Sequence, residues 1–243
     1  MSIFDRSSVY PYTLYRGFWK FLDWVYPPSC AGCGRTGVRW CSDCQGSVQR
    51  ITGELCDRCG LPLPTSAACP TCADRAFILD GLRGYGRYSG PLRNVIHRLK
   101  YHRDVSLAET LSLRLIELFL ETNWVCDLVV PVPLGVVRRR ERGYNQAALI
   151  AYPLALAVRI PYSGRALQRV RETSSQVDLG LSQRLENVRD AFWADASSVK
   201  GKSVLVVDDV MTTGATINEC AKALKEAGAR AVFGLVVART ILT

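Results

Sequence analysis

The chain of 243 residues carries 31 Lys and Arg against 22 Asp and Glu, a formal net charge of +9, and 48% of its residues are hydrophobic. This apolar content is enough for a folded core in one large domain or two unequal ones, which excludes a disordered chain. No apolar run reaches the ~18 residues that span a bilayer, and the N-terminus lacks the pattern of a secretion signal. We therefore expect a cytoplasmic protein whose basic surface favours anionic ligands.

Residues 13–26 predict a short, aromatic-rich helix that ends at Pro27 and Pro28. The apolar side chains that share one stripe of this helix are Leu14, Phe18, Leu22 and Val25. We expect the stripe to pack on the rest of the protein, and docking on a membrane or a partner is the alternative. Residues 1–27 are assigned to this N-terminal amphipathic helix.

Eight of the ten cysteines form four C-x-x-C pairs in the segment from residue 28 to 78. Two residues between thiolates let both sulfurs bind one tetrahedral zinc ion, so the four pairs predict two structural zinc sites of four thiolates each. In the simplest arrangement the first two pairs share one ion and the last two share the other, while interleaved ligation stays open. Disulfides are the alternative, and the missing secretion signal opposes them. The predicted zinc ligands are Cys30, Cys33, Cys41, Cys44, Cys56, Cys59, Cys69 and Cys72.

From residue 79 to 243, apolar strands alternate with helical patterns, which favours an α/β fold with a parallel sheet flanked by helices. The expected elements are, in chain order, a strand at 82–88, helices at 91–101 and 105–121, and a buried strand at 126–134 that ends in a proline-bracketed turn. The run RRRERGYNQ at 138–146 then predicts a basic loop that enters a helix.

The run VLVVDDVMTTGAT at 204–216 places two acids directly after four branched aliphatic residues. Val204–Val207 predicts a fully buried strand, and polarity begins at Asp208. A helix that closes at Gly228 and a second apolar strand at 229–240 complete a parallel βαβ unit. Because ligands bind outside the carboxyl ends of such strands, the acids and the turn that follows predict a binding site.

The residue types in this turn indicate the ligand. Backbone N–H groups of Thr212–Thr216, together with the N-terminus of the following helix, suit a phosphate monoester. Two acids beside it suit the vicinal hydroxyls of a ribose, directly or through hydrated Mg²⁺. The turn therefore predicts a ribose 5-phosphate site, and an ordinary loop with solvated acids is the alternative.

This run resembles the phosphoribosyl pyrophosphate (PRPP) motif of type I phosphoribosyltransferases. Together with PVPL, RRRERGYNQ, RVRETSSQVDLGLSQRLENVRDAF and the leading PPSC of the cysteine segment, it resembles the ComF family, which is linked to competence and DNA utilisation. The resemblance covers nearly the whole chain. It implies a double zinc-binding region at 28–78 and a phosphoribosyltransferase-like domain at 79–243.

The resemblance also implies roles for individual residues. Asp208 and Asp209 would hold the ribose hydroxyls, and the 5-phosphate would be bound by Thr212, Thr213, Gly214, Ala215 and Thr216. The turn that begins with Pro131, Val132 and Pro133 and runs to Gly135 is similar in position to the pyrophosphate loop of that fold. The segment 169–181, with Arg171 and Gln176, is similar to the mobile loop that closes over PRPP.

Positive charge is expected around the leaving pyrophosphate, because arginine forks stabilise phosphate oxygens. The candidates in basic loops are Arg138, Arg139, Arg140, Arg142 and Arg171, and Lys100 lies at the end of a predicted helix. Arg142 joins Asp208 and Asp209 as a candidate catalytic residue, and Arg138 and Lys100 are candidate substrate ligands. Solvated surface charge is the alternative for any one of these arginines. His97 and His102 are expected to be structural or surface residues.

Two functions stay open at this point. The first is an enzyme that transfers the phosphoribosyl group of PRPP, with Mg²⁺, to an unidentified nitrogenous acceptor. The second is an inactive module that senses PRPP or a nucleotide and binds single-stranded DNA or a DNA-processing partner. They differ in whether an acceptor base is bound, and the sequence shows no recognisable hood for a base.

Overall fold

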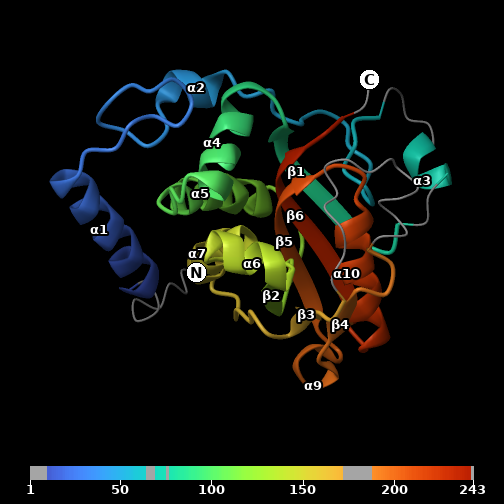
Figure 1. The fold of residues 1–243 in the computed structure, drawn as a ribbon. Coiled ribbons are helices and arrows are strands. Elements are labelled where there is room, and N and C mark those ends of the chain that lie inside the picture. Colours follow the sequence, from blue (N-terminus) through green and yellow to red (C-terminus); the bar gives the residue numbers. More distant parts are fainter. Residues whose placement is uncertain (1–9, 64–68, 75–76, 172–187, 242–243) are drawn as a thin grey trace, which may run out of the picture.

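A four-stranded parallel sheet forms the centre of the protein in the computed structural model, which describes residues 10–63, 69–74, 77–171 and 188–241 (Figure 1). The strands are β1 (Gly81–Arg87), β2 (Leu128–Pro131), β5 (Ser203–Met211) and β6 (Ala231–Arg239). They lie in the order β1-β6-β5-β2, and all neighbouring pairs are parallel. The predicted α/β class with a parallel sheet is confirmed.

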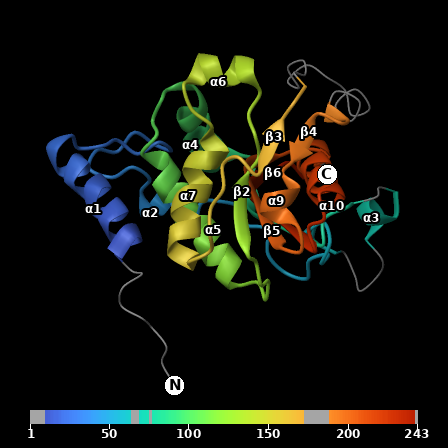
Figure 2. The same ribbon diagram turned by 90° about the horizontal axis from the view of Figure 1, so that it is seen from below.

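Both faces of the sheet are covered, which explains why its central strands are apolar throughout (Figures 1 and 2). The helices α4 (Gly90–Tyr101), α5 (Leu107–Leu120) and α7 (Gln146–Val158) share a core with Leu205 and Val207 of β5. Val204 and Val206 point to the other face, where they pack with the helix α10 (Ala215–Glu226). That face also carries the antiparallel pair β3 (Leu167–Arg169) and β4 (Phe192–Ala194) and the short helix α9 (Ala196–Val199).

Two elements differ from the sequence prediction. The basic segment expected as a loop forms the helix α6 (Val136–Arg142), because Arg and Glu are good helix formers and Gly143 closes it in the left-handed region at φ 83°. Strand β5 continues through both acids to Met211 and pairs with β6 over this length. The strand continues because ladder hydrogen bonds use only the backbone, so a polar side chain does not end it.

The N-terminal helix α1 (Tyr10–Val25) lies against α7 and beside the first part of the cysteine segment, which contains α2 (Ser42–Gly46), whereas α3 (Pro70–Asp74) of the same segment lies at the other side of the sheet (Figures 1 and 2). The expected packing of its apolar stripe on the protein is wrong for most of the stripe. Leu14, Phe18 and Val25 are 70%, 57% and 43% exposed. The helix docks through its other side, where Tyr15 packs edge-to-face on Tyr152 of α7 and Arg16 pairs with Glu109 at 3.3 Å. Among the residues that the structure describes, no helix is long and apolar enough to cross a membrane.

Candidate functional site

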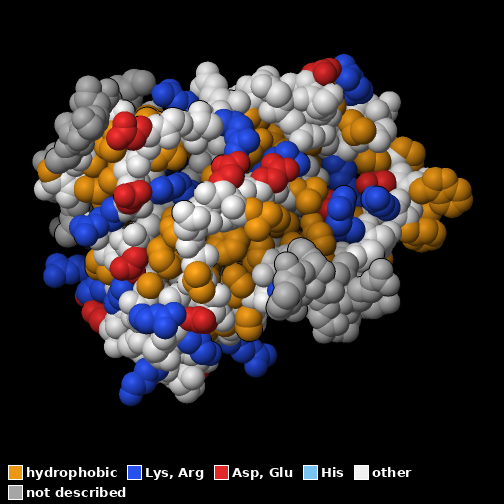
Figure 3. All heavy atoms as spheres, turned by 180° about the vertical axis from the view of Figure 1, so that it is seen from behind, with side chains coloured by type: hydrophobic (Ala, Val, Ile, Leu, Met, Phe, Trp, Pro, Cys, Tyr) orange, Lys and Arg blue, Asp and Glu red, His pale blue; other side chains and the backbone are white. Residues whose placement is uncertain are grey.

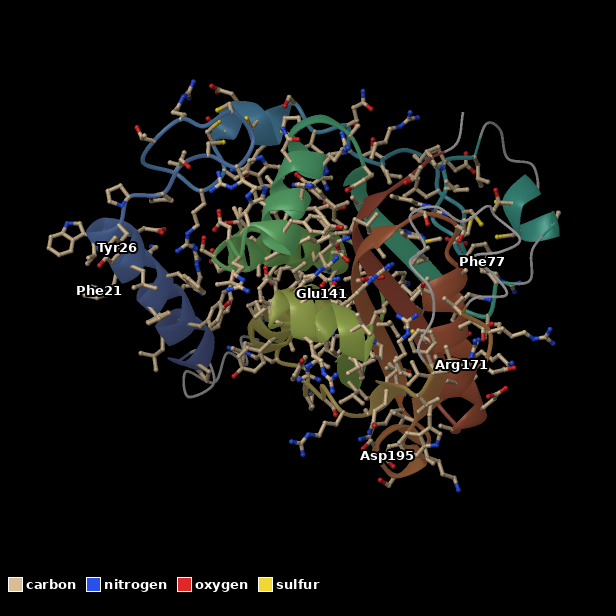
Figure 4. The ribbon with its side chains drawn as sticks, viewed as in Figure 1. Phe21, Tyr26, Phe77, Glu141, Arg171 and Asp195 are labelled. Atoms are coloured by element: carbon tan, nitrogen blue, oxygen red, sulfur yellow. The ribbon has the colours of Figure 1, made fainter. Side chains whose placement is uncertain are left out.

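The eight paired cysteines form two clusters, each of four sulfur atoms that lie within 4.8 Å of one another (Figure 4). The first cluster contains Cys30, Cys33, Cys41 and Cys44, and the second contains Cys56, Cys59, Cys69 and Cys72. The sequential pairing is therefore the observed one, and interleaved ligation is excluded.

The spacing of the sulfur atoms fits tetrahedral zinc. Zn–S bonds of about 2.3 Å place neighbouring sulfurs about 3.8 Å apart. The Sγ atoms of Cys33 and Cys41 are 3.7 Å apart, those of Cys56 and Cys72 are 3.8 Å apart, and those of Cys59 and Cys69 are 3.5 Å apart. These donor sets are two structural zinc sites.

Backbone donors prepare the first zinc site for thiolates. Burial acts to raise the pKa of Cys30, but backbone N–H groups outweigh it and lower that pKa to about 6. Two of these donors are the amides of Gly32 and Cys41, at 3.4 and 3.3 Å from the Cys30 sulfur. Burial and the neighbouring thiols raise the pKa of Cys44 in the same cluster, so the four thiols differ in how readily they ionise.

The second zinc site is attached directly to the sheet. Arg239, at the end of β6 and 3% exposed, donates a hydrogen bond to the carbonyl of Cys59. Arg83 of β1 donates to the carbonyls of Cys56 and Asp57 at 3.2 and 3.1 Å. Gly60 lies so close to β1 that a Cβ there would meet the Leu82 carbonyl oxygen at 2.2 Å.

The two acids of β5 are neighbours whose carboxyl groups lie within hydrogen-bonding reach of each other, and the Asp209 backbone N–H donates to Asp208 Oδ1 at 2.8 Å. Asp209 is 2% exposed and is held on the α4 and α7 side. Its carboxylate lies 2.5 Å from Lys100 Nζ and accepts a hydrogen bond from Gln146 Nε2 at 3.2 Å. Gln146 Oε1 in turn accepts from Arg142 at 2.9 Å. One connected polar network is therefore formed by Lys100, Asp209, Gln146 and Arg142.

The electrostatics of this network separate the two acids. Burial acts to raise the pKa of Asp209, but the charge and hydrogen bond of Lys100 outweigh it, and the pKa lies below the ordinary value. Burial lowers and Asp209 raises the pKa of Lys100, with a net rise, so this pair is ionised. Burial and the neighbouring Asp209 charge raise the pKa of half-buried Asp208 well above the ordinary value.

The two acids also differ in their contacts. The Asp209 carboxylate is engaged inside the protein by Lys100 and Gln146. Asp208 faces the α10 side of the sheet, where its charge reaches Cys220. Asp208 is half-buried, whereas Asp209 is 2% exposed and engaged by Lys100 and Gln146.

The turn after β5 has the geometry predicted for it at the N-terminus of α10. Gly214 has φ 83°, and a Cβ there would lie 2.5 Å from the Met211 side chain and 3.2 Å from Phe77, so only glycine fits without displacement. Thr213 Oγ1 accepts a hydrogen bond from the Ala215 backbone N–H at 3.2 Å. Thr212 is exposed and Thr216 is half-buried.

The turn after β2 is fixed against the same strand end. The backbone N–H of Val132 donates to Val207 at 2.9 Å, and Asn145 Nδ2 donates to the Val132 carbonyl at 2.9 Å. Asn145 Oδ1 also accepts a hydrogen bond from the Ala147 backbone N–H at 3.0 Å, so Asn145 is the N-cap of α7. Pro131 is buried and Pro133 is half-buried beside it.

The remaining candidates differ in how they relate to this strand end. Arg138 and Arg142 of α6 are half-buried, and His97 and His102 are exposed. Arg171 is exposed and donates to the carbonyl of Arg189. Gln176 and the rest of the expected mobile loop from residue 172 lie outside the described residues.

Sequence reasoning missed two residues that support the turn. Phe77 packs against Gly214, and the backbone N–H of Ile78 donates to Asn218 Oδ1 of α10 at 2.7 Å. Phe77 is labelled in Figure 4 between the second cysteine cluster and α10. Both contacts join parts of the chain that are far apart in sequence, so no local pattern could have revealed them.

Comparison with known proteins gives two family models that match along the chain. A double zinc ribbon domain matches residues 21–73, and a phosphoribosyl transferase domain matches residues 116–240. Among solved structures, the glutamine PRPP amidotransferase from B. subtilis, in complex with ADP and GMP, is 25% identical and overlaps with a TM-score of 0.38. It covers 53% of this chain and 25% of that one.

Curated relatives extend over almost the same length. The DNA utilization protein YhgH of Escherichia coli is 33% identical over 214 residues, which is 86% of this chain and 92% of the relative. Competence protein F of Haemophilus influenzae is 32% identical over 77% of this chain and 85% of the relative. With this identity, and with a double zinc ribbon followed by a phosphoribosyltransferase-like domain, the chain belongs to the ComF family.

Proposed function

We propose that this protein binds PRPP with Mg²⁺ at the carboxyl ends of β2 and β5. The observation that carries the proposal is the combination of half-buried Asp208 and the left-handed Gly214 turn on one strand end. The acid suits ribose hydroxyls or a cation, and the N-terminus of the 12-residue helix α10 suits a phosphate. In parallel α/β sheets, ligands bind outside the carboxyl ends of the strands.

Each part of PRPP has a counterpart among the candidate residues. The 5-phosphate would bind the backbone amides of Thr212–Thr216, and Asp208 would hold the ribose hydroxyls or the metal. Arg138 and Arg142 on α6 would face the pyrophosphate as it departs. Asp209 would keep Lys100 charged and in place for the same phosphates.

The donor set is compatible with magnesium. Mg²⁺ prefers oxygen ligands, and it is commonly held by one or two carboxylates together with substrate phosphates. Asp208 is a carboxylate whose raised pKa reflects burial and the Asp209 charge, both of which a bound cation would offset. Bound Mg²⁺ would neutralise charge on the pyrophosphate.

The reaction that these groups support is phosphoribosyl transfer. A nitrogen of the acceptor would form a bond to C1 of the ribose, while the bond from C1 to the pyrophosphate oxygen breaks and pyrophosphate leaves with its electron pair. Positive charge that develops at C1 would lie near Asp208, and fixed cations would receive the leaving group. The acceptor is undetermined.

A second function, binding of single-stranded DNA, is favoured by one surface feature. Tyr101 is 59% exposed at the end of α4, and the Arg142 guanidinium lies over its ring at 5.1 Å. An exposed aromatic ring beside the arginine-rich helix α6 suits base stacking and backbone phosphates. The names of the relatives, which refer to DNA utilization and competence, agree with this function.

Isothermal titration calorimetry of PRPP with Mg²⁺ tests the pocket. Asp208→Asn should weaken binding at least about tenfold, because it removes a charged contact. Asp127→Asn is the matched control, since Asp127 bonds Ser203 at the amino ends of β2 and β5, away from their carboxyl ends, and should leave the affinity unchanged. Equal PRPP affinity in wild type and Asp208→Asn would contradict the proposed site.

Two further measurements separate the functions. Release of pyrophosphate from PRPP with a panel of purine and pyrimidine bases identifies an enzyme, whereas tight binding without turnover identifies a sensor. For DNA, fluorescence anisotropy with a thymidine oligonucleotide should show roughly 5- to 100-fold weaker binding for Tyr101→Ala. Tyr152→Ala, an exposed tyrosine on α7, is the control. Affinity that does not fall with rising salt would contradict DNA binding through phosphates.

A further inference from the structure

The outward stripe of α1 is an exposed hydrophobic surface that no described part of the protein covers. Its members, with exposed fractions, are Leu14 70%, Phe18 57%, Phe21 60% and Val25 43%, and Trp24 at 81% and Tyr26 at 77%, the residue after the helix, flank it. Hydrophobic side chains gather at this edge of the molecule in Figure 3, and Phe21 and Tyr26 point away from it in Figure 4. Contiguous exposed patches of this kind mark interaction sites.

The orientation of α1 is fixed by polar contacts on its inner side. Arg39, whose side chain is 7% exposed, lies 2.8 Å from Asp23 and donates to the Trp19 carbonyl at 3.0 Å. Its guanidinium also lies 4.9 Å from the Trp19 ring centroid. Arg16 pairs with Glu109 of α5 on the same side. These partners anchor the polar side of the helix, so its apolar stripe faces outward.

The spacing of the stripe is that of a helix–helix seam. Leu14, Phe18, Phe21 and Val25 follow one another at intervals of four, three and four residues, which is the a/d pattern of coiled coils. The pattern is symmetric about the midpoint between residues 19 and 20. We propose that α1 of one copy pairs antiparallel with α1 of a second copy, so that Phe18 faces Phe21 and Leu14 faces Val25 across a two-fold axis.

The area of the stripe is sufficient for a specific dimer. At about 150–250 Å² for each aromatic side chain, Phe18 and Phe21 in the seam together with the flanking rings of Trp24 and Tyr26 present roughly 400–700 Å² per copy. Two copies with the aliphatic residues reach the range of about 1,200 Å² at which stable interfaces begin. Gly17 lies next to the seam, and a Cβ there would meet no atom within 4 Å among the described residues, so a partner side chain such as Trp24 has room to pack.

Sedimentation velocity over a concentration series tests the dimer with the full-length, zinc-loaded protein. Phe18→Glu should raise the dimer dissociation constant at least about tenfold, because it buries a charge at the centre of the seam. Leu120→Glu is the matched control, since Leu120 is 70% exposed at the end of α5, outside the stripe, and should leave the dimer unchanged. A wild-type protein that stays monomeric up to about 100 μM, well above the ~1 μM range of weak specific complexes, overturns the proposal.

A charge pair tests the antiparallel register. Phe18→Lys and Phe21→Lys should each weaken the dimer, and Phe18→Lys combined with Phe21→Glu should regain affinity, because residue 18 of one copy then faces the opposite charge on residue 21 of the other. The combination of Phe18→Lys with Phe21→Lys should stay monomeric. Equal weakening by both combinations overturns the antiparallel arrangement. Binding of monomeric wild type to vesicles of anionic phospholipid, lost in Phe18→Glu, also overturns the proposal and assigns the stripe to a membrane.

Discussion

Replacing Lys100 by Met tests the buried ion pair that holds Asp209. At 2.5 Å and an effective dielectric constant of about 20, the attraction between the two charges is about 7 kcal/mol. Desolvation costs several kcal/mol for each ion, so the intact pair contributes little net stability. Removal of one partner is different, because it takes the cation away from a carboxylate whose side chain is 3% exposed and leaves it with the hydrogen bonds of Gln146 and the Asp208 carboxyl. We expect Lys100→Met to lower the free energy of unfolding by about 3–5 kcal/mol.

Urea unfolding at pH 7 measures this loss in wild type, Lys100→Met, Asp209→Asn and the double variant. The double variant carries no buried charge at this pair, so its stability should return to within about 1.5 kcal/mol of wild type. A loss below about 1 kcal/mol in Lys100→Met, or a double variant as unstable as the single one, would refute the assignment of a buried ionised pair.

The same proteins differ in their response to pH. In wild type the pKa of Asp209 is lowered, so its contribution is present above the unfolded value and is lost as the pH falls. In Lys100→Met, no lysine charge offsets burial, so the pKa of Asp209 should rise above its unfolded value. The loss of unfolding free energy relative to wild type is then largest at neutral pH, and it disappears as the pH falls below the pKa of Asp209 in the unfolded chain. The stability gap between the two proteins should therefore narrow from pH 7 toward pH 5.

The remaining predictions concern the turn, the metal and the second acid. Gly214→Ala should lower the melting temperature more than Gly143→Ala, because both residues have φ 83° but only Gly214 would bring a Cβ against neighbouring side chains. Cys59→Ser and Cys33→Ser should each leave one zinc ion per chain by elemental analysis, and only Cys59→Ser should weaken PRPP binding, since its site adjoins the sheet. Asp208→Asn should stabilise the protein at pH 7, by urea unfolding, and the gain should shrink as the pH falls. This sign follows because the pKa of Asp208 is raised, and the stability that protonation provides is lost as pH rises through it. An unchanged or lower stability of Asp208→Asn at pH 7 would contradict the raised pKa.

The zinc sites were predictable because their information is local. Two residues between thiolates fix both sulfurs on one ion, and this holds whatever the surrounding fold. The strand, turn and helix at 203–226 were predictable for a similar reason, since an apolar run, glycine and helical spacing follow one another directly. The spacing did not fix which two C-x-x-C pairs share a zinc ion, and this assignment required the positions of the sulfurs in the folded chain.

Features that depend on tertiary contacts were not predictable. The direction of the α1 stripe follows from the ion pairs of Arg39 with Asp23 and Arg16 with Glu109, which join distant parts of the chain. The different environments of Asp208 and Asp209 follow from Lys100 of α4 and Gln146 of α7, which reach Asp209 from distant parts of the chain. The sequence shows only two adjacent acids after an apolar run, and it does not show which of them a distant lysine reaches.

The second zinc site and the phosphate turn share their supports, which argues that the zinc ribbon is part of the proposed ligand site. Phe77 follows the second cysteine cluster and packs against Gly214, and Ile78 is bonded to Asn218 within α10. Arg239 joins the end of β6 to the Cys59 carbonyl, and β6 pairs with the strand that carries Asp208. A zinc ion with four thiolate ligands carries net negative charge, so buried Arg239 also offsets charge at this contact. Loss of the second zinc should therefore loosen the turn through Phe77 and the strand end through Arg239, whereas the first zinc site packs on α4 and lies farther from the turn in the contact network.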